Sequence, residues 1–171
     1  MDSAILAWVA AHRAAPVDAV MVALSLAGSG GAVWFLIAAV RAAVRPRQAM
    51  AMWQAVLAVV LAWLVADAVL KPIVHRPRPP AGQVAEFAHA SRTSSFPSAH
   101  AATSVAGAVA LGAAWPAARV AVWTLAALIA CSRTYLGLHY PSDVLAGAAL
   151  GWALAWFVCG RTGWRRTAPG R

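Results

Sequence analysis

Long apolar stretches constrain this chain more than any other feature of its sequence. Three of them run for about 20 residues each, at 49–70, 117–137 and 142–160, which is the length that a helix needs to cross a bilayer. Two shorter stretches cover 31–44 and 99–115. Hydrophobic residues make up 62% of the 171 residues and charged residues only 11%, which is too apolar for a soluble protein. The sequence therefore predicts an all-α, polytopic membrane helical bundle that forms one domain.

The first 28 residues are predicted to form a separate N-terminal element. We expect a short interfacial helix anchored by Trp8, followed by a short helix that is partly immersed in the membrane. One straight span over residues 4–27 would place His12 and Asp18 within the membrane, which is costly. The prediction is therefore five transmembrane helices plus this element, or six if the element crosses. The remaining parts are the helical core with the active site, 31–160, and a basic cytoplasmic tail, 161–171.

Positive charge is distributed unevenly along the chain, whose net charge is +9. The cations do not form the groove or stripe that nucleic acid binding requires, so we expect no nucleic acid partner. One group of arginines lies in short loops and in the tail, and placing these in the cytoplasm satisfies the positive-inside rule. The same topology puts a second group on the outer side, where the rule predicts few cations, and a bound anion explains that excess. The second group comprises Lys71, Arg76, Arg78, Arg92 and Arg133.

Three short polar segments interrupt the apolar pattern, and the predicted topology brings all of them to the outer side. They are 71–79, 96–100 and 132–143. The first segment contains Lys71, the only lysine in the chain, and Arg78, which follows prolines that stiffen the backbone. Lys71 alone would also fit a side chain that snorkels to the lipid headgroups. Two cations on a rigid segment facing two histidine motifs favour anion binding instead.

The second segment combines a helix start with a histidine. Ser98 follows Pro97 and precedes a long apolar stretch, so it is expected to be the N-cap of a helix. A plain capped helix would account for the serine by itself. A helix N-terminus also presents unpaired N–H groups that bind phosphate oxygens, and the Ser98 hydroxyl, the Ala99 amide and His100 would then face one site.

The third segment places an arginine, a histidine and a carboxylate close together. Arg133 lies near the end of an otherwise apolar helix, where a charged side chain is costly and usually functional. His139 and Asp143 lie four residues apart across Pro141, which suits the first position of a helix. Asp143 would stabilise the helix dipole in any case. A carboxylate near an imidazole also fixes its tautomer and leaves the other ring nitrogen free to attack.

Together the three segments hold a complete set of groups for hydrolysing a phosphate ester. One histidine would act as the nucleophile and the second as the acid for the leaving oxygen. Lys71, Arg78 and Arg133 would neutralise the phosphoryl oxygens, so we expect neither a metal nor a cofactor. The carboxylates are too scattered for a two-metal centre: Asp2, Asp18, Asp67, Glu86 and Asp143.

In order and spacing, these residues resemble the three signature motifs of the type-2 phosphatidic acid phosphatase superfamily, which also includes vanadium haloperoxidases and glucose-6-phosphatase. The resemblance covers residues 49–160. Its motifs are Lys71-x6-Arg78-Pro79, Pro97-Ser98-Ala99-His100 and Ser132-Arg133-x5-His139-x3-Asp143. The family pattern usually has glycine where this chain has Ala99.

The resemblance implies a role for each matched residue. His139 would form a phosphohistidine, Asp143 would orient it, and His100 would protonate the leaving group and then activate water. The implied phosphate-binding residues are Lys71, Arg78, Ser98, Ala99 through its amide, and Arg133. Asp67 lies one turn before Lys71 and is expected to support it rather than to take part in chemistry. Four further residues are interpreted as solvated loop residues, with headgroup contact as the alternative: His75, Arg76, His89 and Arg92.

These observations predict an integral protein of the bacterial cytoplasmic membrane that hydrolyses a lipid phosphate or diphosphate at the extracytoplasmic face. The resemblance slightly favours undecaprenyl diphosphate as the expected substrate, because small bacterial members of the family resemble undecaprenyl-diphosphate phosphatases. Phosphatidic acid and phosphatidylglycerol phosphate belong to the same substrate class. The alternative is a non-catalytic lipid-phosphate binding or transport protein on the same fold. His100, His139 and Asp143 argue against it, because a binder needs the cations but not the nucleophile.

Overall fold

The computed structural model describes residues 1–85, 88 and 93–160, and this part of the chain is helical with no strand. The predicted tail at 161–171 lies outside the described residues. The α-helices are α1 (Asp2–Ala11), α2 (Ala15–Ala27), α3 (Ala32–Val44), α4 (Ala49–Trp63), α5 (Lys71–Val74), α6 (Ala99–Ala114), α7 (Arg119–Tyr135) and α8 (Pro141–Gly160). Short 3-10 turns are η1 (Ser29–Gly31), η2 (Pro46–Gln48), η4 (Ala81–Gln83) and η5 (Pro116–Ala118), and a π-helical turn is η3 (Leu64–Leu70).

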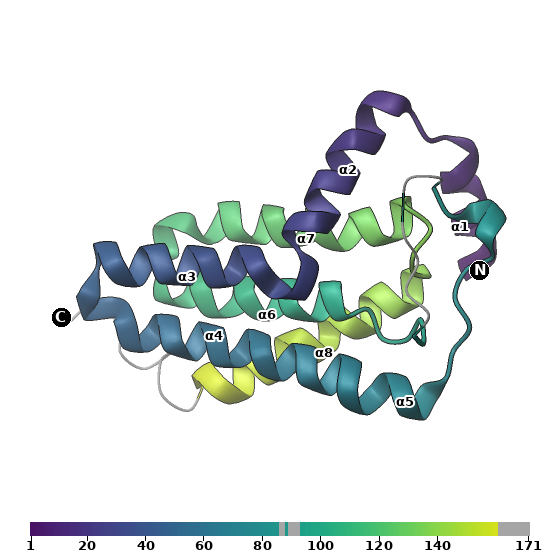
Figure 1. Cartoon of the computed structure of the whole chain (residues 1–171). Helices are drawn as coiled ribbons and strands as arrows, with labels where there is room; N and C mark the ends of the chain where they lie inside the picture. The colour runs from purple at the N-terminus through teal and green to yellow at the C-terminus, as the bar shows by residue number, and fades with distance from the viewer. Residues whose placement is uncertain (86–87, 89–92, 161–171) are drawn as a thin grey trace.

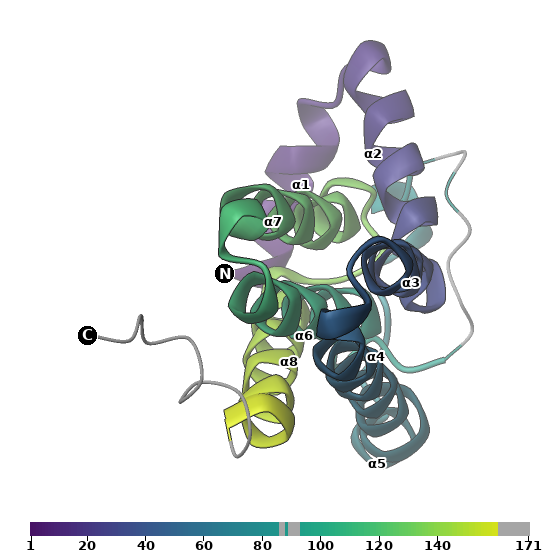
Figure 2. The same ribbon diagram turned by 90° about the vertical axis from the view of Figure 1, so that its left-hand side faces the viewer.

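Helix α6 forms the centre of the bundle. The end-on view shows α3, α4, α7 and α8 arranged around it (Figure 2). Nearly every residue of α6 is buried, and most of them are alanine, glycine, serine or threonine. Small side chains let the surrounding backbones approach closely, which is how helices pack where lipid supplies no hydrophobic driving force.

The outer faces of the surrounding helices carry the large apolar side chains that a lipid environment accommodates. Exposed examples are Leu36 on α3, Trp53 on α4, Trp123 on α7 and Trp156 on α8. The fold class, an all-α membrane bundle, is confirmed. Within the described residues three helical segments are long and apolar enough to span a bilayer, and the bent pair of α2 with η1–α3 would make a fourth. The three segments are Pro46–Val74, Pro116–Tyr135 and Pro141–Gly160.

The predicted number of five or six spans fits only roughly. The segment from Ser29 to Val44 meets α2 at a bend of 50°, so these two helices count as at most one span. Helix α6 has 16 residues, which at 1.5 Å per residue is about 24 Å, short of the bilayer core. Because protein encloses α6, it does not need the length that a lipid-facing helix requires.

The N-terminal element consists of two helices, as predicted, with a break after α1. Helix α2 leans away from the long axis of the bundle (Figure 1). Arg13, in the break, donates from Nε to the Tyr135 carbonyl at 2.8 Å and from Nη2 to the Gln83 carbonyl. The element is therefore fastened to the end of α7 and to η4.

Two glycines of α8, Gly147 and Gly151, form a GxxxG pair that faces α6. A Cβ built on Gly151 would overlap the Ala102 carbonyl, and one on Gly147 would overlap the Ser98 carbonyl. We expect Gly151→Ala to lower the free energy of unfolding by about 1–3 kcal/mol through overpacking, seen as a lower unfolding temperature in detergent. Gly112→Ala, also in a helix, is the control because its Cβ would meet ordinary contacts at 3.4 Å or more. Equal unfolding temperatures for the two variants would contradict the close α6–α8 packing.

Candidate active site

A cavity of about 190 Å³ lies where α5, the start of α6 and the end of α7 meet. The three polar segments of the sequence all contribute to its wall, although they are far apart along the chain. Six of the eight predicted site residues line it: Lys71, Arg78, Ala99, His100, Arg133 and His139. The other two, Ser98 and Asp143, are fully buried. The remaining lining residues are Gly28, Gly30, Trp63, Asp67 and Thr103.

His139 has one ring nitrogen anchored and the other near the cations. Its Nδ1 lies 2.7 Å from the Ser95 carbonyl, which only accepts, so Nδ1 carries the proton. Nε2 is then unprotonated and lies 3.4 Å from Nη1 of Arg78. Burial lowers the pKa of His139 to about 4, Asp143 opposes this shift, and the positive charge of Arg78 adds to it. The imidazole is therefore neutral at pH 7, with a lone pair available for attack.

Asp143 supports the position of His139 indirectly, through Ser95. Its Oδ2 lies 3.7 Å from Nδ1 of His139, which is longer than a hydrogen bond. The carboxylate accepts from the Ser95 hydroxyl and, at 3.0 Å, from the Tyr140 N–H. The Ser95 carbonyl thus fixes the tautomer, while Asp143 holds Ser95 and places a negative charge beside the ring. Direct orientation of His139 by Asp143 stays a prediction, to which the structure adds Ser95 as an intermediary.

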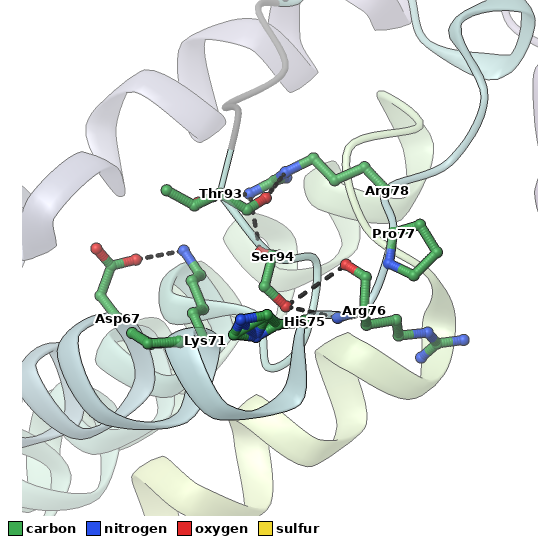
Figure 3. Close-up of a pocket in the computed structure, with 9 residues that line it drawn as sticks. Asp67, Lys71, His75, Arg76, Pro77, Arg78, Thr93 and Ser94 are labelled. Atoms are coloured by element: carbon green, nitrogen blue, oxygen red, sulfur yellow. Dashed lines mark hydrogen bonds and ion pairs between the residues drawn. The ribbon is translucent and has the colours of Figure 1, made fainter.

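Asp67 on the π-helical turn η3 and Lys71, the first residue of α5, both line the cavity. Pro72 follows directly and has no N–H to continue the helical ladder, which accounts for the irregular turn here. Lys71 pairs with Asp67, the intrahelical ion pair that their spacing predicts (Figure 3). Arg78 is held over Thr93, donating from Nε to the Thr93 carbonyl at 2.9 Å. Its Nη1 donates to the Leu138 carbonyl at 2.8 Å and so stays next to His139.

Arg133 lines the cavity and has a buried donor atom without a partner among the described residues. Its side chain is buried, and Nη1 donates to the Ser25 hydroxyl on α2. Its Nε is also buried, and among the described residues it has no hydrogen-bond partner. Buried polar groups are normally paired, and a guanidinium with an unpaired donor at a cationic cavity is suited to bind an anionic group.

His100 faces the same cavity and is held by the N-terminal element. Its Nε2 lies 3.2 Å from the Ser25 carbonyl and 3.5 Å from the Ser29 hydroxyl. Ser98 is the N-cap of α6, as predicted, and accepts from the Ala101 N–H at 3.5 Å. The Ser98 hydroxyl is not part of the cavity wall, whereas its neighbour Ala99 is.

Residues 51–166 match the model of the PAP2 superfamily, the type-2 phosphatidic acid phosphatases. The chain belongs to the PAP2 superfamily. The matched range includes all eight predicted site residues. The predicted family is therefore confirmed.

Curated relatives of this PAP2 chain are phosphatases that act on different lipids. It is 37% identical over 119 residues to decaprenylphosphoryl-5-phosphoribose phosphatase of Mycobacterium tuberculosis (strain CDC 1551 / Oshkosh), a match that covers 64% of this chain and 66% of the relative. It is 42% identical over 73 residues to lipid A 1-phosphatase of Rhizobium johnstonii, covering 43% of this chain and 29% of that protein. The chain thus spans slightly less than two thirds of the mycobacterial relative's length.

Two crystal structures share the fold of this PAP2 chain. The PAP2-type phosphatidylglycerolphosphate phosphatase of Bacillus subtilis superposes with a TM-score of 0.78 at 26% identity, covering 99% of this chain and 87% of that one. LpxE of Aquifex aeolicus superposes with a TM-score of 0.73 at 24% identity, covering 90% and 91%. The likeness to the transmembrane Bacillus protein and the long apolar helices of this chain support an integral membrane protein.

Sequence reasoning missed three residues of this PAP2 site. Ser25 contacts both Arg133 and His100, and Ser95 contacts both His139 and Asp143. The interpretation of Arg76 as a solvated loop residue is wrong, because its guanidinium pairs with the buried Asp143. Only the excess of outer cations gave a signal for Arg76. His89 and Arg92 lie outside the described residues.

Proposed function

We propose that this protein hydrolyses a lipid phosphate or diphosphate without a metal, through a phosphohistidine on His139. The observation that carries the proposal is the neutral imidazole whose free Nε2 lies beside Arg78 in a cavity that Lys71 and Arg133 also line. Three cations around one nucleophile suit the charge of a phosphoryl group in its transition state.

The geometry supports a two-step reaction. In the first step the Nε2 lone pair of His139 attacks phosphorus, the bond to the leaving oxygen breaks, and protonated His100 gives that oxygen a proton. The positive charge that develops on the His139 ring faces Asp143. In the second step neutral His100 takes a proton from water, the water oxygen attacks phosphorus, and the P–N bond breaks to release phosphate.

We propose a polyprenyl diphosphate, such as undecaprenyl diphosphate, as the preferred substrate. The mycobacterial relative acts on a decaprenyl-linked compound according to its name, which supports a polyprenyl chain. A second, outer pocket of about 520 Å³ adjoins the cavity and shares Asp67, Lys71 and Arg78 with it. It supports a headgroup that extends beyond the reacting phosphate, because His75 and Ser94 offer further polar contacts there.

A phosphate-release panel tests this substrate. We expect undecaprenyl diphosphate to give at least about a tenfold higher kcat/KM than phosphatidylglycerol phosphate or phosphatidic acid. His75→Asn should raise KM for the diphosphate alone, because it removes the imidazole from the outer pocket. Asparagine is chosen because it tolerates the left-handed backbone at residue 75, whose φ is 51°. A higher kcat/KM for a diacyl substrate would contradict the polyprenyl preference. If His75→Asn and the wild type have the same KM for the diphosphate, His75 does not contact the headgroup.

The same panel tests whether phosphate release needs a metal. It also tests the alternative that the protein is a lipid-phosphate binder or transporter. Phosphate release should be unchanged in the presence of a chelator and inhibited by vanadate, and a phosphorylated His139 should be trapped during turnover. A chain that binds these lipids and releases no phosphate would favour the binder.

The proposed location is the bacterial cytoplasmic membrane with the site facing outward. The loop between α3 and α4 lies at the opposite end of the bundle from α5 (Figure 1). That loop contains Arg45 and Arg47, and the positive-inside rule places it in the cytoplasm.

A further inference from the structure

Arg76 joins two carboxylates that come from opposite ends of the sequence. Its Nη1 lies 2.5 Å from Oδ1 of Asp143 on α8, and its Nη2 lies 2.8 Å from Oδ2 of Asp2 on α1. The guanidinium also stacks over the Tyr140 ring, 4.4 Å from its centre. Figure 3 shows that the guanidinium points away from Lys71 and from the guanidinium of Arg78. Arg76 therefore does not line the small cavity that contains His139, although it is part of the wall of the outer pocket.

Asp2 fixes the other side of this arginine and also the start of α8. The Ser142 N–H donates to Oδ1 of Asp2 at 3.3 Å, and the Ser142 hydroxyl donates to Oδ2. Arg76 Nη1 lies 2.7 Å from the same hydroxyl. The pKa of Asp2 is lowered by its hydrogen bonds to Ser142 and Arg76, so the carboxylate is charged at neutral pH. Helix α1 is thus fastened to the first turn of α8 at the point where Asp143 enters the site.

Burial distinguishes these two ion pairs. The Asp2 and Arg76 side chains are 26% and 28% exposed, and an exposed pair of this kind adds little stability by itself. The Asp143 side chain is 0% exposed. Among the described residues it forms ion pairs with Arg76 and His139 alone, and His139 is neutral in the resting site. Arg76 is therefore the permanent positive charge that balances the buried carboxylate.

We propose that Arg76, held by Asp2, is a positioning residue that sets the place and the effective charge of Asp143 behind the nucleophile His139. The inference rests on the proposed function. When Nε2 of His139 attacks phosphorus, the ring becomes positive and Asp143 must stabilise it. Arg76 fixes the Asp143 carboxylate beside Nδ1 of His139. Asp2 neutralises part of the positive charge of Arg76, so Asp143 keeps the negative charge that stabilises the positive His139 ring. Helix α1 thereby completes the catalytic site.

Steady-state kinetics of three variants test the proposal. Arg76→Gln should lower kcat about 10- to 100-fold, as is typical for partners behind a catalytic imidazole, and should leave KM nearly unchanged. Arg76→Lys should restore only part of kcat, because one ammonium cannot bridge both carboxylates. Asp2→Asn should lower kcat less than Arg76→Gln. The double variant should be no slower than Arg76→Gln, because Asp2 acts through Arg76.

Arg41→Gln is the matched control and should keep the wild-type kcat. Arg41 also stacks on an aromatic ring, that of Trp115 at 4.2 Å, and bonds one side chain, Gln48 at 2.9 Å, but it lies on α3 far from the site. Unfolding temperatures measured for every variant separate catalysis from stability. The proposal is overturned if the Arg76 variants keep the wild-type kcat, if they change KM alone, or if their loss of activity matches a loss of folded protein.

A second readout needs no lipid substrate. Diethyl pyrocarbonate modifies neutral imidazoles, and mass spectrometry gives the rate for His139. Arg76→Gln should change this rate several-fold, whereas Arg41→Gln should not, and equal rates in all three proteins overturn the proposal. If the wild type hydrolyses none of the lipids, the proposed function fails, and the modification rates still decide the role of Arg76.

Discussion

Replacement of His139 by alanine is expected to abolish phosphate release, with a fall in kcat of at least about 10⁴-fold. The reason is that Nε2 of His139 is the neutral nitrogen next to Arg78, while its Nδ1 is occupied by the Ser95 carbonyl. Phosphate release from purified protein in detergent measures the effect. The phosphohistidine that forms in the wild type should be missing in the variant.

His139 is buried, so a loss of activity has to be separated from a loss of folding. His139→Asn serves this purpose, because an asparagine amide can still donate to the Ser95 carbonyl but has no nucleophilic nitrogen. It should unfold near the wild-type temperature and remain inactive. Unchanged phosphate release in either variant would refute His139 as the nucleophile and leave the protein without the mechanism proposed for it.

Replacement of Arg133 by glutamine should have the next largest effect. We expect kcat/KM to fall about 10³-fold, the magnitude typical for removing a preorganised donor to a developing negative charge. The structural reason is that Arg133 lines the same cavity as His139, and its buried Nε has no hydrogen-bond partner among the described residues. Lysine should not restore activity, because it lacks the planar fork that binds two oxygens at once.

Arg119→Gln provides the matched control for Arg133, since both arginines belong to α7 and lie at its opposite ends. Arg119 donates to the Gly112 carbonyl at 3.4 Å and is remote from the cavity, so its loss should leave kcat/KM unchanged. Ser25→Ala removes the hydroxyl that holds Arg133 and should weaken substrate binding without removing a charge. Wild-type kcat/KM in Arg133→Gln would show that this arginine is structural.

The positions of the helices could be read from the sequence because the apolar stretches end at prolines, glycines and charges. The stretch predicted at 117–137 became α7, Arg119–Tyr135, and the one predicted at 142–160 became α8, Pro141–Gly160. The lipid exposure of a stretch could not be read in this way. The stretch at 99–115 is apolar like the others, and only its small side chains indicate a helix surrounded by protein.

The site was predictable where residue type and spacing carry the chemistry. Two histidines, three basic side chains and Asp143 stand in motifs whose spacing brings them together. Ser95 and Ser25 could not be found, because their contacts use a backbone carbonyl or a hydroxyl that any serine supplies. The role of Arg76 depends on its ion pair with Asp2, 74 positions away, and no local sequence pattern predicts a contact at that separation.

Because other helices enclose α6, the residues at its start, including His100, are separated from the outer surface of the bundle. His100 lies in the first turn of α6, which is buried along nearly its whole length, whereas α4, α7 and α8 expose large apolar side chains. The position of His100 therefore depends on contacts between helices more than on the lipid around the bundle.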